Sequence, residues 1–367
     1  MNKCIGIAIG IVLVFLPGCL LGQKSSPATA PPNSADMPRI HLQYKTNKDP
    51  VLLPSLVAGM PQCGLDGQQL MEFRIPPSYF EAGVYSISDS NQVRSFTPPP
   101  ADDGMTTGIM QFDATDQNVY LLTMSAPQWK KKPATDDDDS GRSKAKEKPK
   151  QRYNIVRFDS DGQQEESVSL DLPFRPVHFG AFKDGRFFVI GIDDVNLVTQ
   201  AAILNPDGSL RAFTDLSSVF RSSESLMASV PPGFSSAPRD LKLTIGANML
   251  RIGHVPGGLA LMLINIHGKI PIIGQDGAVH AITPHIPKGY FVDSTLNSTD
   301  KLLLRVRTSD TSDEEHLLMD INPLDGSLTR IVDTGDVPAS GFACEHDGEF
   351  LMLHWIDKKP HVQIGKP

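Results

Sequence analysis

Short runs of apolar or alternating residues, separated by Asp-Gly turns, recur along most of the chain. Asp-Gly occurs eight times, and seven of these pairs lie between two such runs. An Asp-Gly pair flanked by alternating hydrophobic residues is the strongest short-range signal of a β-hairpin. The pattern therefore predicts an all-β protein that consists mainly of hairpins.

The clearest repeating unit spans residues 176–215. Its runs VHFGAF and RFFVIGI flank the turn Lys183-Asp184-Gly185, and AAILN and SLRAFTD flank the turn Pro206-Asp207-Gly208. Residues 289–334 repeat this order of runs, including Asn-Pro before the second turn and Gly-Ser-Leu around its end. This self-similarity predicts four-stranded meanders that repeat along the chain.

Weaker copies of the unit begin near Gly59, Gly108 and Met249, and a sixth begins at Ser340 with only three strands. Residues 39–45 (RIHLQYK) alternate as a strand does and would supply the missing strand. The sequence thus predicts a six-bladed β-propeller of four-stranded antiparallel blades, with this N-terminal strand closing the last blade. Seven blades are the alternative if 217–248 contain one, but Ser and Pro enrichment favours a loop there.

The pattern of the N-terminal residues predicts an export signal. Lys3 precedes an apolar run over residues 4–16, which is too short to span a bilayer. Two cleavage sites compete: residues 16–19 (LPGC) resemble the lipobox of bacterial lipoproteins and would lipidate Cys19, whereas Gly22 offers ordinary signal cleavage. We expect a signal segment over 1–22, a flexible linker over 23–38 and one propeller domain over 39–367, in the periplasm, outside the cell or anchored to a membrane.

Charge excludes some partners. The formal net charge is −8 at pH 7 and becomes −9 once Lys3 is removed. The protein therefore offers no broad basic face to a phosphate backbone, and we expect no nucleic acid partner.

The insert 126–152 contains segregated basic and acidic runs and is expected to be disordered. A calcium site at Asp136–Asp139 is the alternative, but calcium loops space their carboxylates around a Gly turn. We expect the chain to be a monomer.

The runs FKDGRFFVIG and EHDGEFLMLHW resemble the repeats of six-bladed NHL-repeat and gluconolactonase-like propellers. The likeness extends from Gly59 to the C-terminus and concerns architecture only. It implies one alternative function, a hydrolase or lyase with calcium or zinc in the central channel, held by carboxylates and an asparagine of different blades. Without that alternative no cofactor is expected.

The turns and the long connections are predicted to lie on opposite faces of the disc. The long connections are 98–107, 125–152, 216–248 and 309–315. Loops that a rigid scaffold displays together commonly bind ligands, so we expect this loop-bearing face to bind a protein, peptide or glycan. The alternative is that surface loops simply tolerate insertions.

Polar residues at the start of the inner strands are candidates for the lining of the central channel. They are Arg175, His178, Arg251, Tyr290 and Asp293. The alternative is that they cap strands or hydrogen-bond neighbouring blades. The ten histidines are scattered without a third ligand at zinc-like spacing, so no metal site is predicted. No nucleophile elbow, zinc-protease motif, phosphate loop or dinucleotide fingerprint occurs, so no catalytic residues are identified.

Cys63 and Cys344 occupy matched positions, three residues before the turn aspartate in C-G-L-D-G and C-E-H-D-G. In a closed ring they would lie on neighbouring inner strands of the first and last blades. In an oxidising compartment the two cysteines could form a disulfide that links the first blade to the last and closes the propeller. Two buried free thiols are the alternative, and Cys19 is then either lipidated or removed with the signal.

Overall fold

The computed structural model describes residues 37–52, 62–64, 68–75, 78–101, 105–127, 151–217, 236–240, 242, 250–263, 269–298, 301–308, 316–337 and 341–367. The predicted signal segment, most of the linker, most of the insert 126–152 and most of the segment proposed for a seventh blade lie outside these residues. The side chains of Cys63 and Asp293 do so too. In the described part, no helix is long and apolar enough to cross a membrane.

Four of the hydrogen-bonded sheets have four antiparallel strands each, in chain order. The first contains β3 (Gln62–Gly64), β4 (Gln68–Ile75), β5 (Ser78–Ile87) and β6 (Val93–Phe96). The second contains β7 (Met105–Ala114), β8 (Val119–Pro127), β9 (Arg152–Phe158) and β10 (Gln164–Ser169). The third contains β11 (Arg175–Ala181), β12 (Phe187–Asp193), β13 (Val198–Leu204) and β14 (Leu210–Phe213). The fourth contains β15 (Leu250–Val255), β16 (Gly258–Leu263), β17 (Ile270–Gly274) and β18 (Val279–Ile282).

The remaining strands form one nine-stranded sheet. It contains the meander β19 (Tyr290–Ser298), β20 (Leu302–Thr308), β21 (His316–Ile321) and β22 (Leu328–Asp333). It also contains β23 (Phe342–His346), β24 (Glu349–Ile356) and β25 (Lys359–Lys366), with β1 (Arg39–His41) and β2 (Gln43–Thr46) at its two edges.

The described strands therefore form five sheets, and the prediction of six separate blades is wrong. The last two predicted blades share the nine-stranded sheet. There, β19 and β23 pair in parallel through Asn297 with Cys344 and Ser298 with Glu345. The Ser298 hydroxyl also donates to the Glu345 carboxylate over 2.7 Å. These bonds bring the two inner strands close enough to join what would otherwise be two sheets.

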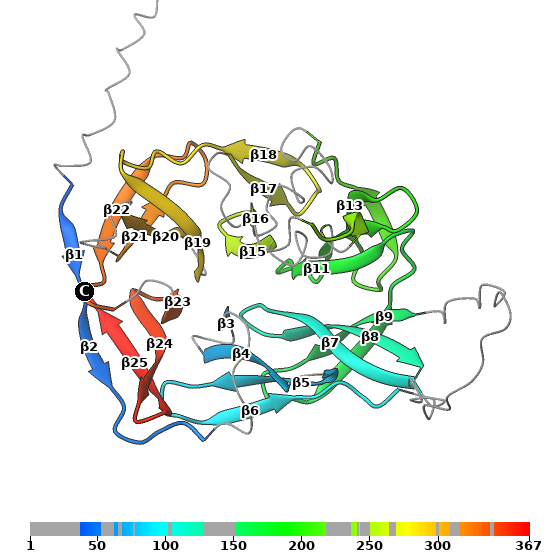
Figure 1. The fold of residues 1–367 in the computed structure, drawn as a ribbon, viewed down its shortest axis with the longest axis horizontal. Helices are drawn as coiled ribbons and strands as arrows, with labels where there is room; N and C mark the ends of the chain where they lie inside the picture. The colour runs from blue at the N-terminus through cyan, green and yellow to red at the C-terminus, as the bar shows by residue number, and fades with distance from the viewer. Residues whose placement is uncertain are drawn as a thin grey trace, which may run out of the picture.

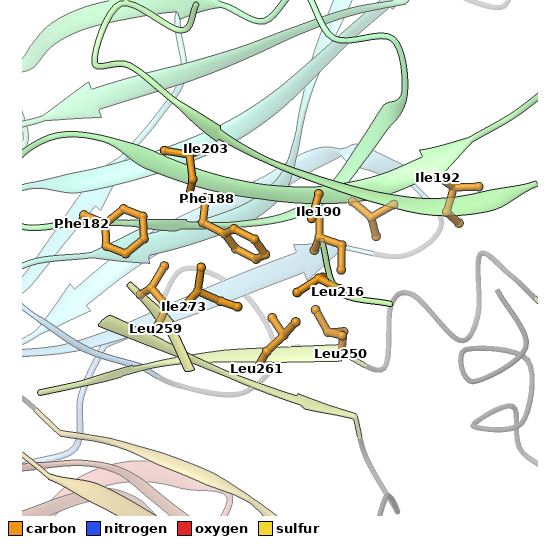
Figure 2. Close-up of a cluster of buried hydrophobic side chains, with 12 residues drawn as sticks. Phe182, Phe188, Ile190, Ile192, Ile203, Leu216, Leu250, Leu259, Leu261 and Ile273 are labelled. Carbon is orange, nitrogen blue, oxygen red and sulfur yellow. The ribbon is translucent and has the colours of Figure 1, made fainter. Parts of the chain in front are cut away.

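The sheets stand around a common centre, and the fold is a β-propeller of antiparallel four-stranded blades (Figure 1). The strands nearest the centre are β3, β7, β11, β15, β19 and β23, and neighbours in this series contact one another. Hydrophobic cores lie between successive sheets. Figure 2 shows one of them, in which Phe188 and Ile203 of the third sheet pack against Leu259 and Ile273 of the fourth.

The segment 39–45 was predicted to form one strand of the last blade, and the structure divides it into two. β1 pairs in parallel with β22, whereas β2 pairs antiparallel with β25. The division falls at Leu42, whose N–H donates to the Asp333 carbonyl and whose side chain packs into the core between these strands. The segment from β1 to β2 thus pairs with both halves of the nine-stranded sheet, and Leu42 and Tyr44 are its inward-facing residues.

The Asp-Gly turns have the backbone that their sequence predicts. Six of the eight glycines are described, and all six have positive φ, as in Gly185 (83°) and Gly208 (81°). In four of them the aspartate carboxylate before the glycine accepts an N–H from two residues further on, as Asp207 does from Ser209 over 3.0 Å. Glycine supplies the left-handed conformation and aspartate closes the turn, which explains why this dipeptide recurs.

These pairings separate the two faces of the ring. In each antiparallel meander the first-to-second and third-to-fourth connections lie on one side, which we name the turn face. The opposite side, the loop face, receives the connections after β6, β8, β14 and β20. Most residues of these long connections lie outside the described part, so their role stays a prediction.

Candidate functional site

A cavity opens at the turn-face end of the central channel. Its volume is about 80 Å³, which suits a few water molecules or one small polar group. It is lined by the ends of the inner strands and the turns that follow them, including Gly64, Asp116, Lys183, His254 and Ser298. This cavity therefore lies on the turn face, opposite the face that the sequence favoured for binding.

A buried ion pair lies beside this cavity. The His254 Nε2 atom on β15 lies 2.9 Å from Oδ1 and 3.0 Å from Oδ2 of Asp113 on β7. The Ala181 N–H of β11 donates to the same carboxylate over 2.6 Å. Asp113 and His254 have side chains 6% and 20% exposed. One carboxylate thus connects three inner strands, and it is satisfied by two donors, as a buried charge requires.

The pKa of the His254 imidazole lies above its usual value of 6.5. Burial disfavours the charged ring and lowers the pKa. The Asp113 carboxylate, through its charge and its hydrogen bond, and the charge of Asp116 together outweigh burial, while Lys183 acts in the lowering direction. Because a carboxylate only accepts hydrogen bonds, Nε2 is the donor to Asp113, and Nδ1 is the second ring nitrogen.

A second ion pair stands at the rim of the cavity. The Lys183 ammonium lies 2.9 Å from Oδ2 of Asp116, and both side chains are exposed. An ammonium has three N–H donors, so the bond to Asp116 leaves Lys183 with further donor capacity. The cavity thus has two cationic donors, the imidazolium of His254 and the ammonium of Lys183.

Another buried carboxylate holds the seam of the nine-stranded sheet. The Glu345 side chain is fully buried and accepts from the Lys301 ammonium over 2.7 Å and from the Gly348 N–H over 2.9 Å, as well as from the Ser298 hydroxyl. These contacts lie at the turn-face ends of β19 and β23. These contacts hold the two inner strands β19 and β23 together.

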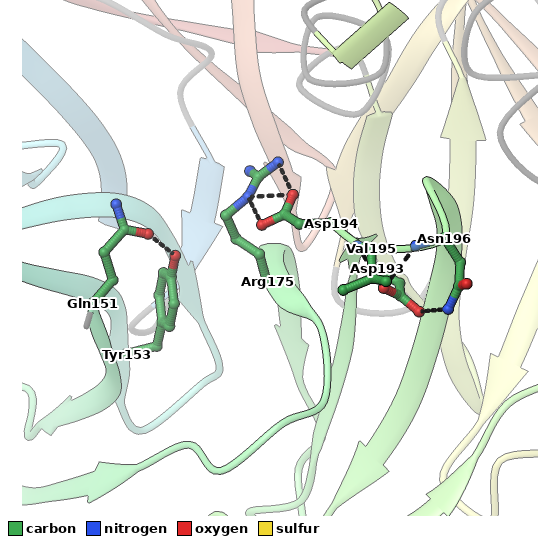
Figure 3. Close-up of polar contacts among 7 residues, drawn as sticks. All are labelled: Gln151, Tyr153, Arg175, Asp193, Asp194, Val195 and Asn196. Carbon is green, nitrogen blue, oxygen red and sulfur yellow. Dashed lines mark hydrogen bonds and ion pairs between the residues drawn. The ribbon is translucent and has the colours of Figure 1, made fainter. Parts of the chain in front are cut away.

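On the loop face, polar contacts surround the start of β11 (Figure 3). The Arg175 guanidinium donates from Nε and Nη2 to the Asp194 carboxylate over 3.1–3.3 Å. Nearby, the Tyr153 hydroxyl donates to Gln151 over 2.6 Å. Burial raises the pKa of Tyr153 to about 12, with the charge of Arg175 acting in the lowering direction and that of Asp194 in the raising direction. Tyr153 therefore stays neutral at ordinary pH.

The turn beyond β12 is held by Asp193. Its carboxylate accepts from the Val195 N–H over 2.9 Å and from the Asn196 side-chain amide over 2.7 Å (Figure 3). These bonds, led by the one from the Asn196 side chain, lower the pKa of Asp193. They fix a turn that presents Val195 to solvent with 89% of its surface exposed.

The five predicted channel residues lie on three inner strands, β11, β15 and β19. Arg175 pairs with Asp194, as above, and His178 is buried with Nδ1 2.5 Å from the Gln111 amide. The Arg251 guanidinium donates to the Leu250 carbonyl, and the Tyr290 hydroxyl accepts from Arg39. The Asp293 side chain lies outside the described residues, and the ligand-binding role of all five remains a prediction.

Cys344 is fully buried on β23 and takes part in a disulfide. β3, which carries Cys63, lies against β23. Since the Cys63 side chain is outside the described residues, the pairing of the two cysteines remains a prediction. Lipidation of Cys19 also concerns a residue outside them.

Metal binding receives no support from the described side chains. Among them, no three His, Cys, Asp or Glu residues lie close enough to hold a metal ion together. The calcium alternative at Asp136–Asp139 falls outside the described part of the chain.

Sequence reasoning missed Asp113 and His254. A signal for Asp113 was present: it lies three residues before Asp116, the position that Cys63 and Cys344 occupy before their own turns. Aligning the repeats on their turns would have placed this carboxylate at the position of Cys63 and Cys344. His254 has no such signal, because its partner lies in another repeat.

No family model and no curated protein sequence matches the chain. Among solved structures, it is similar to a streptogramin B lyase, with 12% identity over 88% of this chain and 97% of that chain and a TM-score of 0.35. It is also similar to YCF48 bound to D1 peptide, with 10% identity over 90% and 99% of the chains and a TM-score of 0.40.

A third similar structure is a subtype N11 neuraminidase-like protein of A/flat-faced bat/Peru/033/2010. It has 7% identity over 90% of this chain and 95% of that chain, with a TM-score of 0.42. Likenesses at this level carry no argument about activity or ligand. The functional reasoning below therefore uses only the residues of this chain.

Proposed function

We propose that the chain is an exported binding module that holds its ligand on the loop face of the propeller. The observation that supports this most is the location of exposed apolar side chains. Of the eight large apolar residues exposed in the described part, five lie on the loop face: Leu52, Val195, Phe291, Trp355 and Ile356. Leu210 and Leu324 lie on the turn face, and Phe213 lies on an outer edge strand.

Trp355 and Ile356 are adjacent members of this set. They end β24 at the tip of a hairpin, with exposed fractions of 50% and 40%. The two turn residues that follow, Asp357 and Lys358, both have positive φ, as in the tight two-residue turns of β-hairpins. A short, well-defined turn thus holds an exposed tryptophan, the residue type most enriched among side chains that dominate binding energy.

Polar groups accompany these apolar side chains on the same face. The Arg175–Asp194 ion pair and the neutral Tyr153 lie near the exposed Val195. Protein interfaces commonly combine an apolar centre with a polar rim. Of the three ligand classes considered, protein, peptide and glycan, the apolar side chains favour a protein or peptide.

Three further statements belong to this proposal. The chain is exported and works as a monomer, its N-terminal linker tethers the propeller, and Cys19 carries a lipid. Mass spectrometry of the mature N-terminus tests the last point: a diacylated or triacylated Cys19 supports it, and an unmodified N-terminus at Gln23 contradicts it. We do not advance a metal-dependent hydrolase or lyase, because no observation in the described residues favours one.

Arrays of envelope proteins, peptides and glycans, probed with the mature chain, test the binding function. For any ligand found, we expect Trp355→Ser to weaken binding by about tenfold or more, since such side chains contribute about 2 kcal/mol or more. Leu324→Ser is the matched control, because Leu324 is 81% exposed but lies on the turn face. Equal effects of the two substitutions would contradict the assignment of the loop face.

A further inference from the structure

We propose that the cavity at the turn-face end of the channel is a second binding site, for a carboxylate group held by His254 and Lys183. The two side chains come from different sheets and line the same cavity. This site is independent of the loop-face function, because it lies at the opposite end of the channel.

The first donor is Nδ1 of His254. Asp113 accepts from Nε2, so the protonated imidazole, whose side chain lines the cavity, has Nδ1–H as its second donor. Asp113 is itself held by the Ala181 N–H and has little freedom to move toward a ligand. The buried carboxylate thus orients the ring and stabilises its positive charge, while the outward N–H remains available.

The second donor is the Lys183 ammonium. Its bond to Asp116 occupies one N–H, and two more can bind an incoming oxygen. A carboxylate has two oxygens and can accept one hydrogen bond from each cation, and such charge-assisted bonds are the strong ones. The cavity of about 80 Å³ admits such a group with few further atoms.

The charged groups that face His254 predict how binding depends on pH. They are Asp113 on β7, Asp116 in the turn after β7, and Lys183 in the turn after β11. When the imidazole is neutral, the charges of Asp113, Asp116, Lys183 and His254 sum to one negative charge, so the site repels an anionic ligand. With the imidazole protonated, the sum is zero and Nδ1 is a donor. A carboxylate therefore binds the protonated form, and its binding raises the pKa of His254 by linkage.

Acetate is the probe, and NMR of the His254 Cε1–H signal is the measurement. The full mature chain is titrated with pH in sodium acetate and in sodium chloride at equal ionic strength. We expect acetate to raise the His254 titration midpoint and to bind about tenfold more tightly near pH 6 than near pH 8.

Two variants separate this site from general charge effects. Lys183→Met should weaken acetate binding by about tenfold, whereas Lys269→Met, which removes an exposed lysine on the loop face, should leave it unchanged. A His254 titration curve that is the same in acetate and chloride would overturn the proposal. Equal losses in the two lysine variants would overturn it as well. Neither outcome bears on binding at the loop face.

Discussion

Asp113 and His254 form an ion pair across the strand that lies between theirs, with His254 Nε2 2.9 Å from Asp113 Oδ1. The intervening strand, β11, contributes the Ala181 N–H to the same carboxylate. Three successive sheets are thus connected at the turn-face end of the channel by one buried side chain. The pair adds a polar contact between the sheets of the propeller, besides the hydrophobic cores that lie between them.

Asp113→Asn should destabilise the protein strongly. The substitution keeps the shape but removes the charge that stabilises protonated His254, and breaking a buried pair typically costs about 3–5 kcal/mol. Urea unfolding at pH 6 measures the change. Asp116→Asn is the control, because this exposed partner of Lys183 should contribute less than about 1 kcal/mol. Similar losses in the two variants would show that Asp113 does not connect the sheets as described.

The free energy of unfolding should fall as the pH rises above neutrality, through the titration of His254. Its pKa is raised in the folded protein, so its stabilising contribution is complete below the unfolded value of 6.5 and is lost as the pH rises through the folded pKa. Denaturation between about pH 6 and about pH 9 measures this loss. His254→Gln should flatten that part of the profile, and an unchanged slope in the variant would contradict the assignment.

Gly326→Ala should cost more stability than Gly348→Ala. Both glycines have φ near 80°, so each substitution pays about 1–2 kcal/mol for the left-handed backbone. A Cβ at Gly326 would lie 2.2 Å from the Thr283 carbonyl oxygen of the neighbouring sheet, whereas nothing lies within 4 Å at Gly348. We expect a further loss of about 1–3 kcal/mol at Gly326. Equal melting temperatures of the two variants would refute this close contact between sheets.

Cys63 and Cys344 should be joined, and the bond should close the ring. Cys344→Ser is expected to destabilise the protein by about 2–5 kcal/mol, the usual cost of losing a native disulfide. Cys63→Ser should cost the same, and the double variant should cost no more than either single one. Peptide mapping without reductant identifies the bond directly. Recovery of Cys63 as a free thiol would contradict the pairing.

The hairpins could be predicted from the sequence because their signals are local. A turn such as Asp207-Gly208 carries within itself the two features it needs, a carboxylate acceptor and a residue that tolerates positive φ. The order of strands in each meander follows from these turns. Most strand positions in the repeats were therefore predictable without any knowledge of long-range contacts.

The contacts between repeats were not predictable in the same way. The pairing of Asn297 with Cys344 joins two repeats, and nothing in either segment alone indicates it. The division of residues 39–45 at Leu42 likewise depends on where Asp333 and the core beneath it lie. Asp113 could have been noticed by aligning the turns, but His254 acquires its role only from a partner in another sheet.

Site-specific photo-crosslinking in the producing cell tests the central claim, binding at the loop face, most directly. A photoreactive phenylalanine analogue is placed at Trp355 or Val195 on the loop face, and at Leu324 or Leu210 on the turn face, all exposed positions. The account predicts a covalent adduct of one defined mass from the loop-face positions and none of that mass from the turn-face positions. The same adduct from both faces, or from the turn face alone, would contradict it.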